Sequence, residues 1–326
     1  MIPSEIKLKP TYNIFTLLIC FLINFMSCDR ESKETVPTKE PYLIVLGIAQ
    51  DGGFPQAGTK ESEAWDDLSK RRHVSCLAII DPETSERWMI DATPDFRVQL
   101  HFLDEIAPVP DTPGLAGIFL THAHIGHYTG LMHLGREAIG AKNVPVYAMS
   151  KMYEFLTNNA PWDLLVRLKN IELRPLSDQV TVTLNDEIRI TPFLVPHRAE
   201  YTETVGYRID GPNKCVIFIP DIDKWEDWDE WGTRIEDMIK DLDVAYLDGT
   251  FYADGEIPGR NMSEIPHPFI MESMKRFSSL PPEEKKKIRC IHLNRTNPAL
   301  IDGSDARKEI EKAGFRVAKE LEIVGL

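Results

Sequence analysis

The segment THAHIGHYTGL (residues 121–131) constrains the fold of this chain most, because three of its nine histidines fall within six residues. The preceding AGIFLTH is predicted to be a strand. His122 and His124 then lie at its carboxyl end and point the same way by the two-residue period of strands. His127 begins a predicted helix, YTGLMHLGREAI. Imidazoles that converge at a strand–helix junction predict a metal site, because imidazole is a common ligand of zinc and iron.

The chain from residue 41 onward alternates short apolar, β-branched runs with segments that carry apolar residues at helical spacing. This alternation predicts sheets covered by helices, and hence an α/β domain. The expected strands are 42–49, 73–80, 87–92, 116–122, 144–149, 188–195, 204–209, 214–220, 244–250 and 288–293. The expected helices are 95–106, 150–158, 234–242, 267–277 and 304–314.

The histidine motif, HAHIGH followed by Gly130 and Leu131, resembles the HxHxDH signature of the metallo-β-lactamase fold superfamily. Asp91 in MIDATPD resembles the buried aspartate that precedes the metal loop in that superfamily. The resemblance implies a four-layer αββα sandwich with a single catalytic domain over residues 41–326. Four further stretches resemble the pyrroloquinoline-quinone biosynthesis B branch of the superfamily: LGIAQDGGFPQ, VPHRAEYTETVGYRI, YLDGTF and IHLNRTNP.

The resemblance also implies a set of metal ligands and catalytic residues. His197 corresponds to the third histidine ligand, Asp221 to the metal-bridging aspartate and His292 to the last histidine. Asp221 and His292 are the expected catalytic residues. The first metal is assigned to three neutral donors, which leave an open position for water: His122, His124 and His197. Asp221 bridges or completes that site, and His127 and His292 remain for a second metal.

Two departures from the superfamily pattern affect this assignment. Gly126 stands where the superfamily has an aspartate ligand, which leaves the second site one ligand short. Asp248 and His267 are weaker candidates to fill the gap. Asp248 is equally well explained as a turn residue before Gly249, and His267 as a residue at a helix start that contacts substrate. The cysteine cluster that follows GGFPQ in the quinone-biosynthesis branch is also absent, and with it a structural zinc site.

Other segments supply candidates with weaker signals. The paired glycines of GIAQDGGFPQ permit a close backbone approach that brings Gln50 and Asp51 toward the cavity, although a plain tight turn explains the glycines as well. Candidate substrate contacts are the polar residues that flank the matching ligands: Arg198, Tyr201, Asn294, Arg295 and Asn297.

The amino terminus reads as a secretion signal. Two lysines precede an apolar run over residues 14–26, which ends at Ser27-Cys28 and then turns polar. Cysteine after a small residue resembles a bacterial lipobox, with Cys28 as the lipidated first residue of the mature protein. Residues 1–28 are then the signal peptide and 29–40 a polar tether. An amino-terminal anchor helix is the alternative. Both interpretations predict an exported protein, and the first predicts a cell-envelope lipoprotein attached to the membrane through Cys28.

Composition narrows the function. A net charge of -14 argues against nucleic acid as a partner, because phosphate binding needs clustered Lys and Arg. No CxxC pair exists, so Cys76, Cys215 and Cys290 are expected to be buried and unreactive. The leading prediction is a hydrolase with one or two Zn²⁺ ions that cleaves an ester, lactone, amide or phosphodiester bond of a small molecule. Iron-dependent oxygen chemistry, as in quinone-cofactor biosynthesis, and non-catalytic metal-dependent binding are the alternatives. The oligomeric state stays open.

Overall fold

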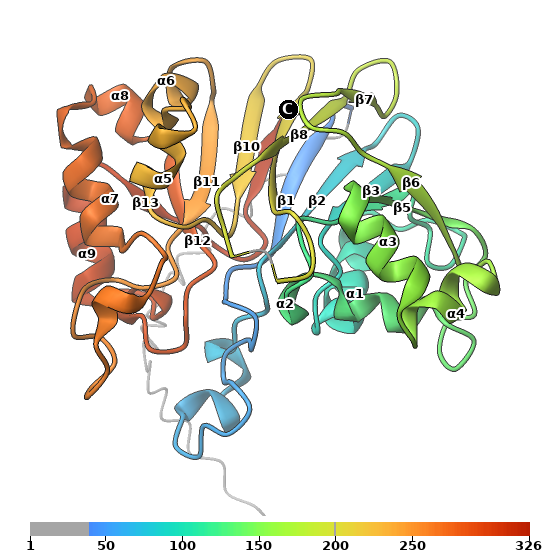
Figure 1. The fold of residues 1–326 in the computed structure, drawn as a ribbon, viewed down its shortest axis with the longest axis horizontal. Helices are drawn as coiled ribbons and strands as arrows, with labels where there is room; N and C mark the ends of the chain where they lie inside the picture. The colour runs from blue at the N-terminus through green and yellow to red at the C-terminus, as the bar shows by residue number, and fades with distance from the viewer. Residues whose placement is uncertain (1–38, 199) are drawn as a thin grey trace, which may run out of the picture. The chain divides into compact units, whose positions relative to one another are not determined.

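A computed structural model of the chain describes residues 39–198 and 200–326. These residues form two seven-stranded sheets that face each other, with helices on both outer sides (Figure 1). The predicted four-layer αββα sandwich is therefore confirmed. The apolar run over residues 14–26, Cys28 and most of the proposed tether lie outside the described residues.

The first sheet has the order β14-β1-β2-β3-β4-β5-β6. Strands β3 to β6 run parallel to one another, so their carboxyl ends share one edge. The strands are β1 (Tyr42–Gly47), β2 (Cys76–Asp81), β3 (Glu86–Ile90), β4 (Gly117–Phe119), β5 (Val144–Ala148), β6 (Ile171–Pro175) and β14 (Ile323–Gly325).

The second sheet has the order β13-β12-β11-β10-β9-β8-β7. Strands β10 to β13 are parallel, whereas β7, β8, β9 and β10 pair antiparallel in sequence order. The strands are β7 (Val182–Thr183), β8 (Arg189–Leu194), β9 (Val205–Asp210), β10 (Cys215–Ile219), β11 (Val244–Asp248), β12 (Ile288–Ile291) and β13 (Arg316–Val317).

Helices cover the outer face of each sheet. Beside the first sheet lie α1 (Phe96–Ile106), α2 (Ile125–Tyr128), α3 (Ser150–Asn158) and α4 (Trp162–Arg167). Beside the second lie α5 (Trp225–Glu230), α6 (Ile235–Lys240), α7 (Ile270–Arg276), α8 (Pro282–Lys285) and α9 (Asp305–Lys312). Short 3₁₀ turns occupy Glu63–Trp65, Leu68–Lys70, Thr129–Leu134, Met262–Glu264, Phe277–Ser279 and Pro298–Leu300.

The core follows from strand periodicity. In β1, Leu43 and Val45 face the second sheet, whereas Tyr42, Ile44 and Leu46 face the helices of the first sheet. Both faces are buried, so the strand reads as a continuous apolar run. Every predicted strand and helix has a counterpart in the structure, apart from one helix beside the histidine motif.

The predicted helix over residues 128–139 is wrong. The chain instead forms the four-residue α2 followed by a 3₁₀ turn over Thr129–Leu134. Two backbone bonds join this segment to the residues that follow β3: Gly130 N donates to Ala92 O at 2.8 Å, and Ala92 N donates to His127 O at 2.8 Å. Gly130 permits this contact, because a Cβ there would lie 2.6 Å from the Cβ of Phe96. The helical spacing of its apolar residues predicted a helix, because the spacing carries no information about these backbone bonds to the sheet.

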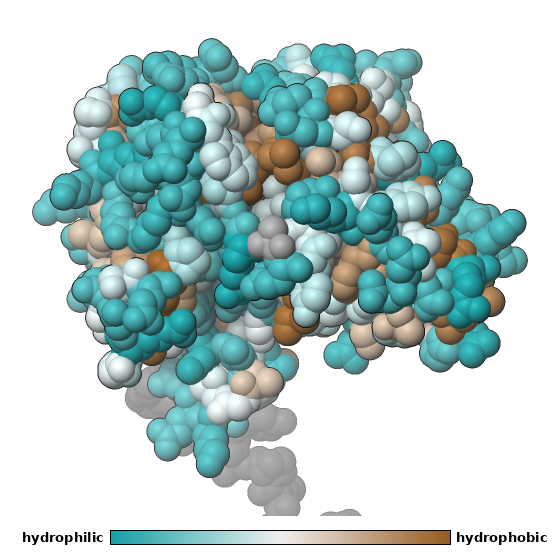
Figure 2. Space-filling view, viewed as in Figure 1, coloured by the Kyte–Doolittle hydropathy of each residue, from teal (hydrophilic) through white to brown (hydrophobic). Residues whose placement is uncertain are grey.

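Three surface and redox features complete the description. Hydrophobic side chains appear on the face shown in Figure 2 as small patches among hydrophilic ones. The cysteines of the described residues, Cys76, Cys215 and Cys290, are buried and form no disulfide, as predicted. Among the described residues no helix is long and apolar enough to cross a membrane.

Candidate metal centre

The site lies where the strands of both sheets end. Asp91 follows β3, the histidine motif follows β4, His197 follows β8, and Asp221 follows β10. Asp248 is the last residue of β11 and pairs with Ile291 of β12, which places it beside His292. Carboxyl ends of neighbouring parallel strands meet at one edge of a sheet, and this edge is where open α/β sheets bind ligands. Residues far apart in sequence thus converge.

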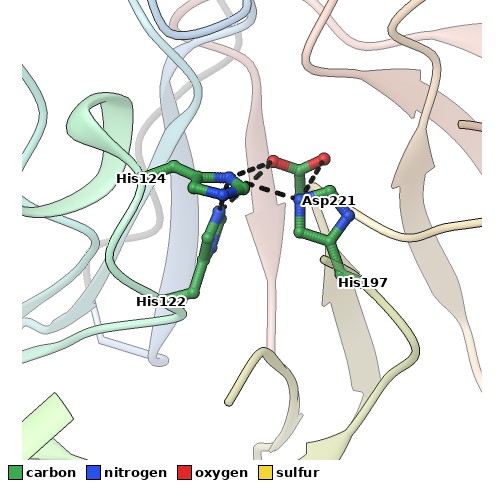
Figure 3. Close-up of side chains that lie close together, drawn as sticks. All are labelled: His122, His124, His197 and Asp221. Atoms are coloured by element: carbon green, nitrogen blue, oxygen red, sulfur yellow. Dashed lines mark hydrogen bonds and ion pairs between the residues drawn. The ribbon is translucent and has the colours of Figure 1, made fainter. Parts of the chain in front are cut away.

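The first group contains His122, His124, His197 and Asp221. His122 and His124 come from one loop, and the ring of His197 lies opposite them beside the Asp221 carboxylate (Figure 3). His124 Nδ1 lies 2.8 Å from His122 Nε2 and 3.3 Å from His197 Nε2. Tetrahedral zinc with bonds of about 2.0–2.1 Å separates its ligand atoms by about 3.3 Å. The His124–His197 separation equals this value and the His122–His124 separation is shorter, and all the ligand atoms of the group lie within 4.8 Å of one another, so the group can hold one ion.

The second group contains Asp51, His127, Asp221 and His292. Asp51 Oδ1 lies 3.2 Å from His127 Nε2 and 3.3 Å from His292 Nε2. His127 and His292 are buried. The structure brings the carboxylate of Asp51, rather than Asp248 or His267, to the Nε2 atoms of these two histidines.

Asp221 joins the two groups. Its Oδ2 lies 3.4 Å from His122 Nε2 and 3.7 Å from His127 Nε2, so one oxygen faces both sets of imidazoles. Its Oδ1 lies 3.5 Å from His197 Nε2 and 3.2 Å from His267 Nδ1. This is the placement expected of a bridging carboxylate.

Asp248 and His267 form a third group with Asp221. The Asp248 oxygens accept bonds from Ile222 N, from the Thr250 amide and hydroxyl, and from His267 Nδ1 at 2.8 Å. Burial lowers the pKa of His267, but the Asp248 and Asp221 carboxylates outweigh burial and raise it to about 9. The contacts make this pair a support for Asp221.

The second ring nitrogen of each metal-facing histidine is also occupied. His127 Nδ1 lies 2.7 Å from Asp91 Oδ2, His197 Nδ1 lies 2.9 Å from Asp223 Oδ1, and His124 Nε2 lies 3.1 Å from Glu200 Oε2. The hydroxyls of Thr121 and Thr250 lie 3.0 Å from His122 Nδ1 and His292 Nδ1. Such outer partners fix the orientation of metal-ligating imidazoles. Asp223, Glu200 and the two threonines were not anticipated from sequence.

Two buried polar atoms show that these residues suit a metal. His127 Nε2 and Asp221 Oδ1 form no hydrogen bond of acceptable geometry with any described residue. Leaving such atoms unpaired costs about 1–3 kcal/mol each. Both face the centre of the cluster, and a donor set of imidazoles and carboxylates fits zinc or iron. The cluster is a metal-binding one.

The surrounding imidazoles favour the ionised form of the carboxylates, which is the form that binds a cation. Burial raises the pKa of Asp221, but the surrounding imidazoles outweigh it and hold the pKa well below its usual value. Asp51 behaves alike, because His127 and His292 lower its pKa against burial. Burial lowers the pKa of His127, whereas Asp91 and Asp51 raise it well above its usual value. Protonation and metal binding therefore compete for His127.

Backbone strain is concentrated at the same place. Asp91 has a φ of 68° and His292 a φ of 63°, in the left-handed region that favours glycine. Non-glycine residues held there cost about 1–3 kcal/mol each and cluster at functional sites. Asp91 Oδ1 accepts from the Thr121 amide at 2.8 Å, which ties it to the start of the histidine loop. The predicted buried aspartate thus lies beneath that loop.

The weaker substrate candidates fall in different environments. Arg198 and Tyr201 are exposed and line a shallow hollow over His122 and His124. Asn294 is half-buried and Arg295 exposed, beyond His292. Asn297 is buried, its Nδ2 donates to Gly249 O at 2.8 Å, and its Oδ1 accepts from Ala299 N at 2.9 Å. Nothing in the contacts of Asn297 points to a substrate.

The fold and the histidine–aspartate cluster together define a metallo-β-lactamase-like metal protein. The chain belongs to the family described as the Beta-lactamase superfamily domain, which matches residues 86–288. Coenzyme PQQ synthesis protein B from Ruegeria pomeroyi is 27% identical over 310 residues, which cover 86% of this chain and 99% of that protein. The same-named protein from Bradyrhizobium diazoefficiens is 27% identical over 315 residues, 84% of this chain and 96% of that one.

Solved structures agree on the fold. The crystal structure of Zn²⁺-bound PqqB from Methylobacterium extorquens has a TM-score of 0.72 at 22% identity, covering 87% of this chain and all of that one. A diphosphatase from the PhnP family has a TM-score of 0.59 at 20% identity, covering 88% of this chain and 97% of that one. The predicted resemblance to the superfamily and to its quinone-biosynthesis B branch is confirmed.

Proposed function

We propose that this protein is a metal-dependent hydrolase that acts on an ester, lactone, amide or phosphodiester bond of a small molecule. The observation that carries the proposal is the first group, where three histidine nitrogens and one carboxylate oxygen face a single point. When bound there, a metal ion would supply an activated water and polarise the scissile carbonyl or phosphoryl oxygen. Neutral imidazole donors leave the ion open for both.

The residues of the chain hold and orient the reacting groups. His122, His124 and His197 would hold the first ion, and His127 and His292 a second. Asp221 would serve both through Oδ2. His267, whose Nδ1 lies 2.8 Å from Asp248, faces the other oxygen of Asp221 at 3.2 Å, and this ion pair helps to orient the carboxylate toward the two groups. Preorganisation of this kind is what hydrolytic sites need.

Two exposed side chains beside the first group are proposed to contact the substrate. Arg198 and Tyr201 flank His124, where Arg198 lies 3.7 Å from Glu200 and the Tyr201 ring contacts Phe155. The guanidinium of Arg198 is suited to an anionic group, and the phenol ring of Tyr201 to an apolar one. Both are proposed as substrate contacts, and Asn294 is retained as a third.

A second candidate function is iron-dependent oxygen chemistry. It is favoured by the relatives named coenzyme PQQ synthesis protein B, which match almost end to end. Histidine sites with open positions also suit iron. Metal-dependent binding without turnover is the third candidate.

Metal analysis and turnover of one native preparation separate these candidates. We expect zinc, with hydrolysis of chromogenic esters or phosphodiesters, and loss of both metal and turnover in the His122→Ala/His124→Ala variant. Iron accompanied by oxygen consumption would favour the second candidate. A native preparation that contains its metal, but neither hydrolyses the chromogenic substrates nor consumes oxygen, would favour metal-dependent binding without turnover. Metal content unchanged in the double variant would remove the site assignment itself.

We also propose that the protein is an exported lipoprotein of the bacterial envelope, held through Cys28. This proposal rests on the sequence of the amino terminus alone, and it is independent of the metal centre.

A further inference from the structure

The second metal group raises a question about Gly126, which lies in α2 next to His127. A Cβ at this position would lie 2.6 Å from the Cγ of Asp51 and 2.7 Å from its Cα. These distances are shorter than real Cβ contacts. The side chain of Asp51 therefore fills the space into which a residue at 126 would project.

Conformation does not require glycine at this position. The positive-φ glycines of the described residues do not include Gly126, which belongs to a helical turn. Space is the reason instead. Any side chain at 126 would displace the loop that carries Asp51.

The Asp51 carboxylate does not stabilise its own loop through any hydrogen bond among the described residues. The contacts that it makes through Oδ1 are to His127 Nε2 at 3.2 Å and His292 Nε2 at 3.3 Å. No backbone amide or hydroxyl among the described residues donates to it, in contrast to Asp248, whose oxygens are all engaged. Its side chain is only 17% exposed. A nearly buried carboxylate aimed at two imidazole nitrogens is a cation ligand by its chemistry.

The loop that carries Asp51 is tied to the segment that carries His292. Gln50 N donates to Leu293 O at 2.9 Å, and Leu293 N donates to Ile48 O at 2.8 Å. Gly53 N then closes a turn onto Gln50 O at 2.8 Å. Asp51 is thereby fixed on both sides, as a preformed ligand must be.

We propose that Asp51 is the carboxylate ligand of the second metal. The absence of a side chain at Gly126 leaves the space that the Asp51 side chain occupies. The carboxylate that the superfamily motif places at 126 is supplied here from the loop after β1. This inference rests on the proposed metal centre, but it concerns how many ions are held rather than what reaction follows.

The test compares zinc bound per chain and zinc affinity across five full-length proteins: wild type, three single variants and one double variant. The Asp51→Asn substitution keeps the shape of the side chain but removes its charge. We expect wild type to bind two ions, and Asp51→Asn to keep the first with its affinity for the second lowered by more than about tenfold. Asp66→Asn, on an exposed aspartate, is the matched control and should behave as wild type.

The exchange itself is tested by moving the carboxylate. Gly126→Asp alone should also lose the second ion, because it collides with Asp51. Asp51→Gly combined with Gly126→Asp should recover it. Thermal unfolding of the metal-free proteins checks that each variant is folded.

The inference fails if Asp51→Asn binds two ions with unchanged affinity, or if wild type binds a single ion and Asp51→Asn the same. Absence of hydrolytic turnover, with the second ion lost in Asp51→Asn, would refute the proposed function and leave this inference standing. Loss of both ions in a folded Asp51→Asn would also overturn it, since the first group does not include Asp51.

Discussion

At the scale of single residues, the site is defined by what each imidazole does with both of its nitrogens. His197 turns Nε2 toward Asp221 and holds Asp223 with Nδ1. The same division applies to the other four metal-facing histidines. An outer acceptor fixes the ring and keeps the inward nitrogen free of a proton, so its removal should weaken metal binding without touching a ligand.

We predict that Asp223→Asn lowers the affinity of the first site by about 10–100-fold. The amide can reverse its donor and acceptor, so His197 loses a fixed tautomer rather than its contact. Titration of the metal-free protein with zinc measures the change. Asp227→Asn, an exposed aspartate of α5, is the control. Equal affinity in Asp223→Asn and wild type would show that the outer partner has no influence on the site.

Some of these residues were predictable and others were not. The spacing of His122, His124 and His127 identified a metal loop because three ligands lie within one turn. Asp51 was recognised only as a residue that could face the cavity, since the pairing of its loop with the segment of His292 is a long-range contact. Asp223 was missed, although its position two residues after Asp221 places both on one side of an extended segment.

At the scale of elements, the first sheet depends on an ion pair that sequence does not reveal. Arg87 of β3 is fully buried and donates to the carbonyls of Ala107, Pro113 and Gly114 at 2.7–3.0 Å. It also pairs with Asp104 of α1 at 2.8 Å. One guanidinium thus fastens the connection from α1 to β4 onto β3.

We predict that Arg87→Met lowers the free energy of unfolding by about 2–4 kcal/mol, because buried carbonyls are left without donors. Asp104→Asn should cost less than about 1 kcal/mol, since its carboxylate is 51% exposed. Chemical denaturation of both variants gives the comparison. A smaller loss for Arg87→Met than for Asp104→Asn would contradict this account.

A second contact between elements should depend on pH. His73, which precedes β2, faces Glu320, which precedes β14, at 3.3 Å, with Asp95 and Arg72 nearby. Burial lowers the pKa of His73, but Glu320 and Asp95 outweigh it and raise the pKa above the usual value. A raised folded pKa stabilises the protein below the unfolded pKa, and this stability is lost as pH rises through the folded pKa.

Glu320→Gln should therefore destabilise the protein by about 1 kcal/mol near pH 5.5, below the usual histidine pKa of about 6.5, and less near pH 9. The backbone bond from His73 N to Glu320 can persist with glutamine, which isolates the charge. Thermal unfolding at the two pH values measures the difference. A cost that grows with pH would reverse the sign of this argument.

The elements themselves were largely readable from the sequence. Runs such as YLIVLG form strands because both faces are buried, and this needs no long-range information. Short or partly exposed strands such as β6, β7, β13 and β14 escaped, because they have little apolar patterning. The helix expected after the metal loop failed where backbone bonds to Ala92 competed with helical ones.

At the scale of the whole molecule, the net charge bears on the proposed substrate class, and the amino-terminal sequence bears on the proposed location. A net charge of -14 repels polyanions, and for this reason we propose small molecules rather than nucleic acid as substrates. The strands of both sheets all lie within the described residues. The proposed export signal rests on the sequence of the amino terminus alone.

The last prediction concerns attachment to the membrane through Cys28. A basic start, an apolar run over residues 14–26 and Ser27-Cys28 together resemble an envelope lipoprotein signal. Stable membrane attachment needs more than one acyl chain, and a diacylated amino-terminal cysteine would supply it. In a bacterial host, wild type should therefore incorporate labelled palmitate and fractionate with membranes. Cys28→Ala should lose the label and accumulate unprocessed or unattached, while Cys20→Ala is the control and should behave as wild type.

Because the metal centre does not involve residue 28, purified Cys28→Ala should bind as much zinc as wild type. Equal labelling of Cys28→Ala and wild type would place the lipid elsewhere or replace it with a simple anchor helix.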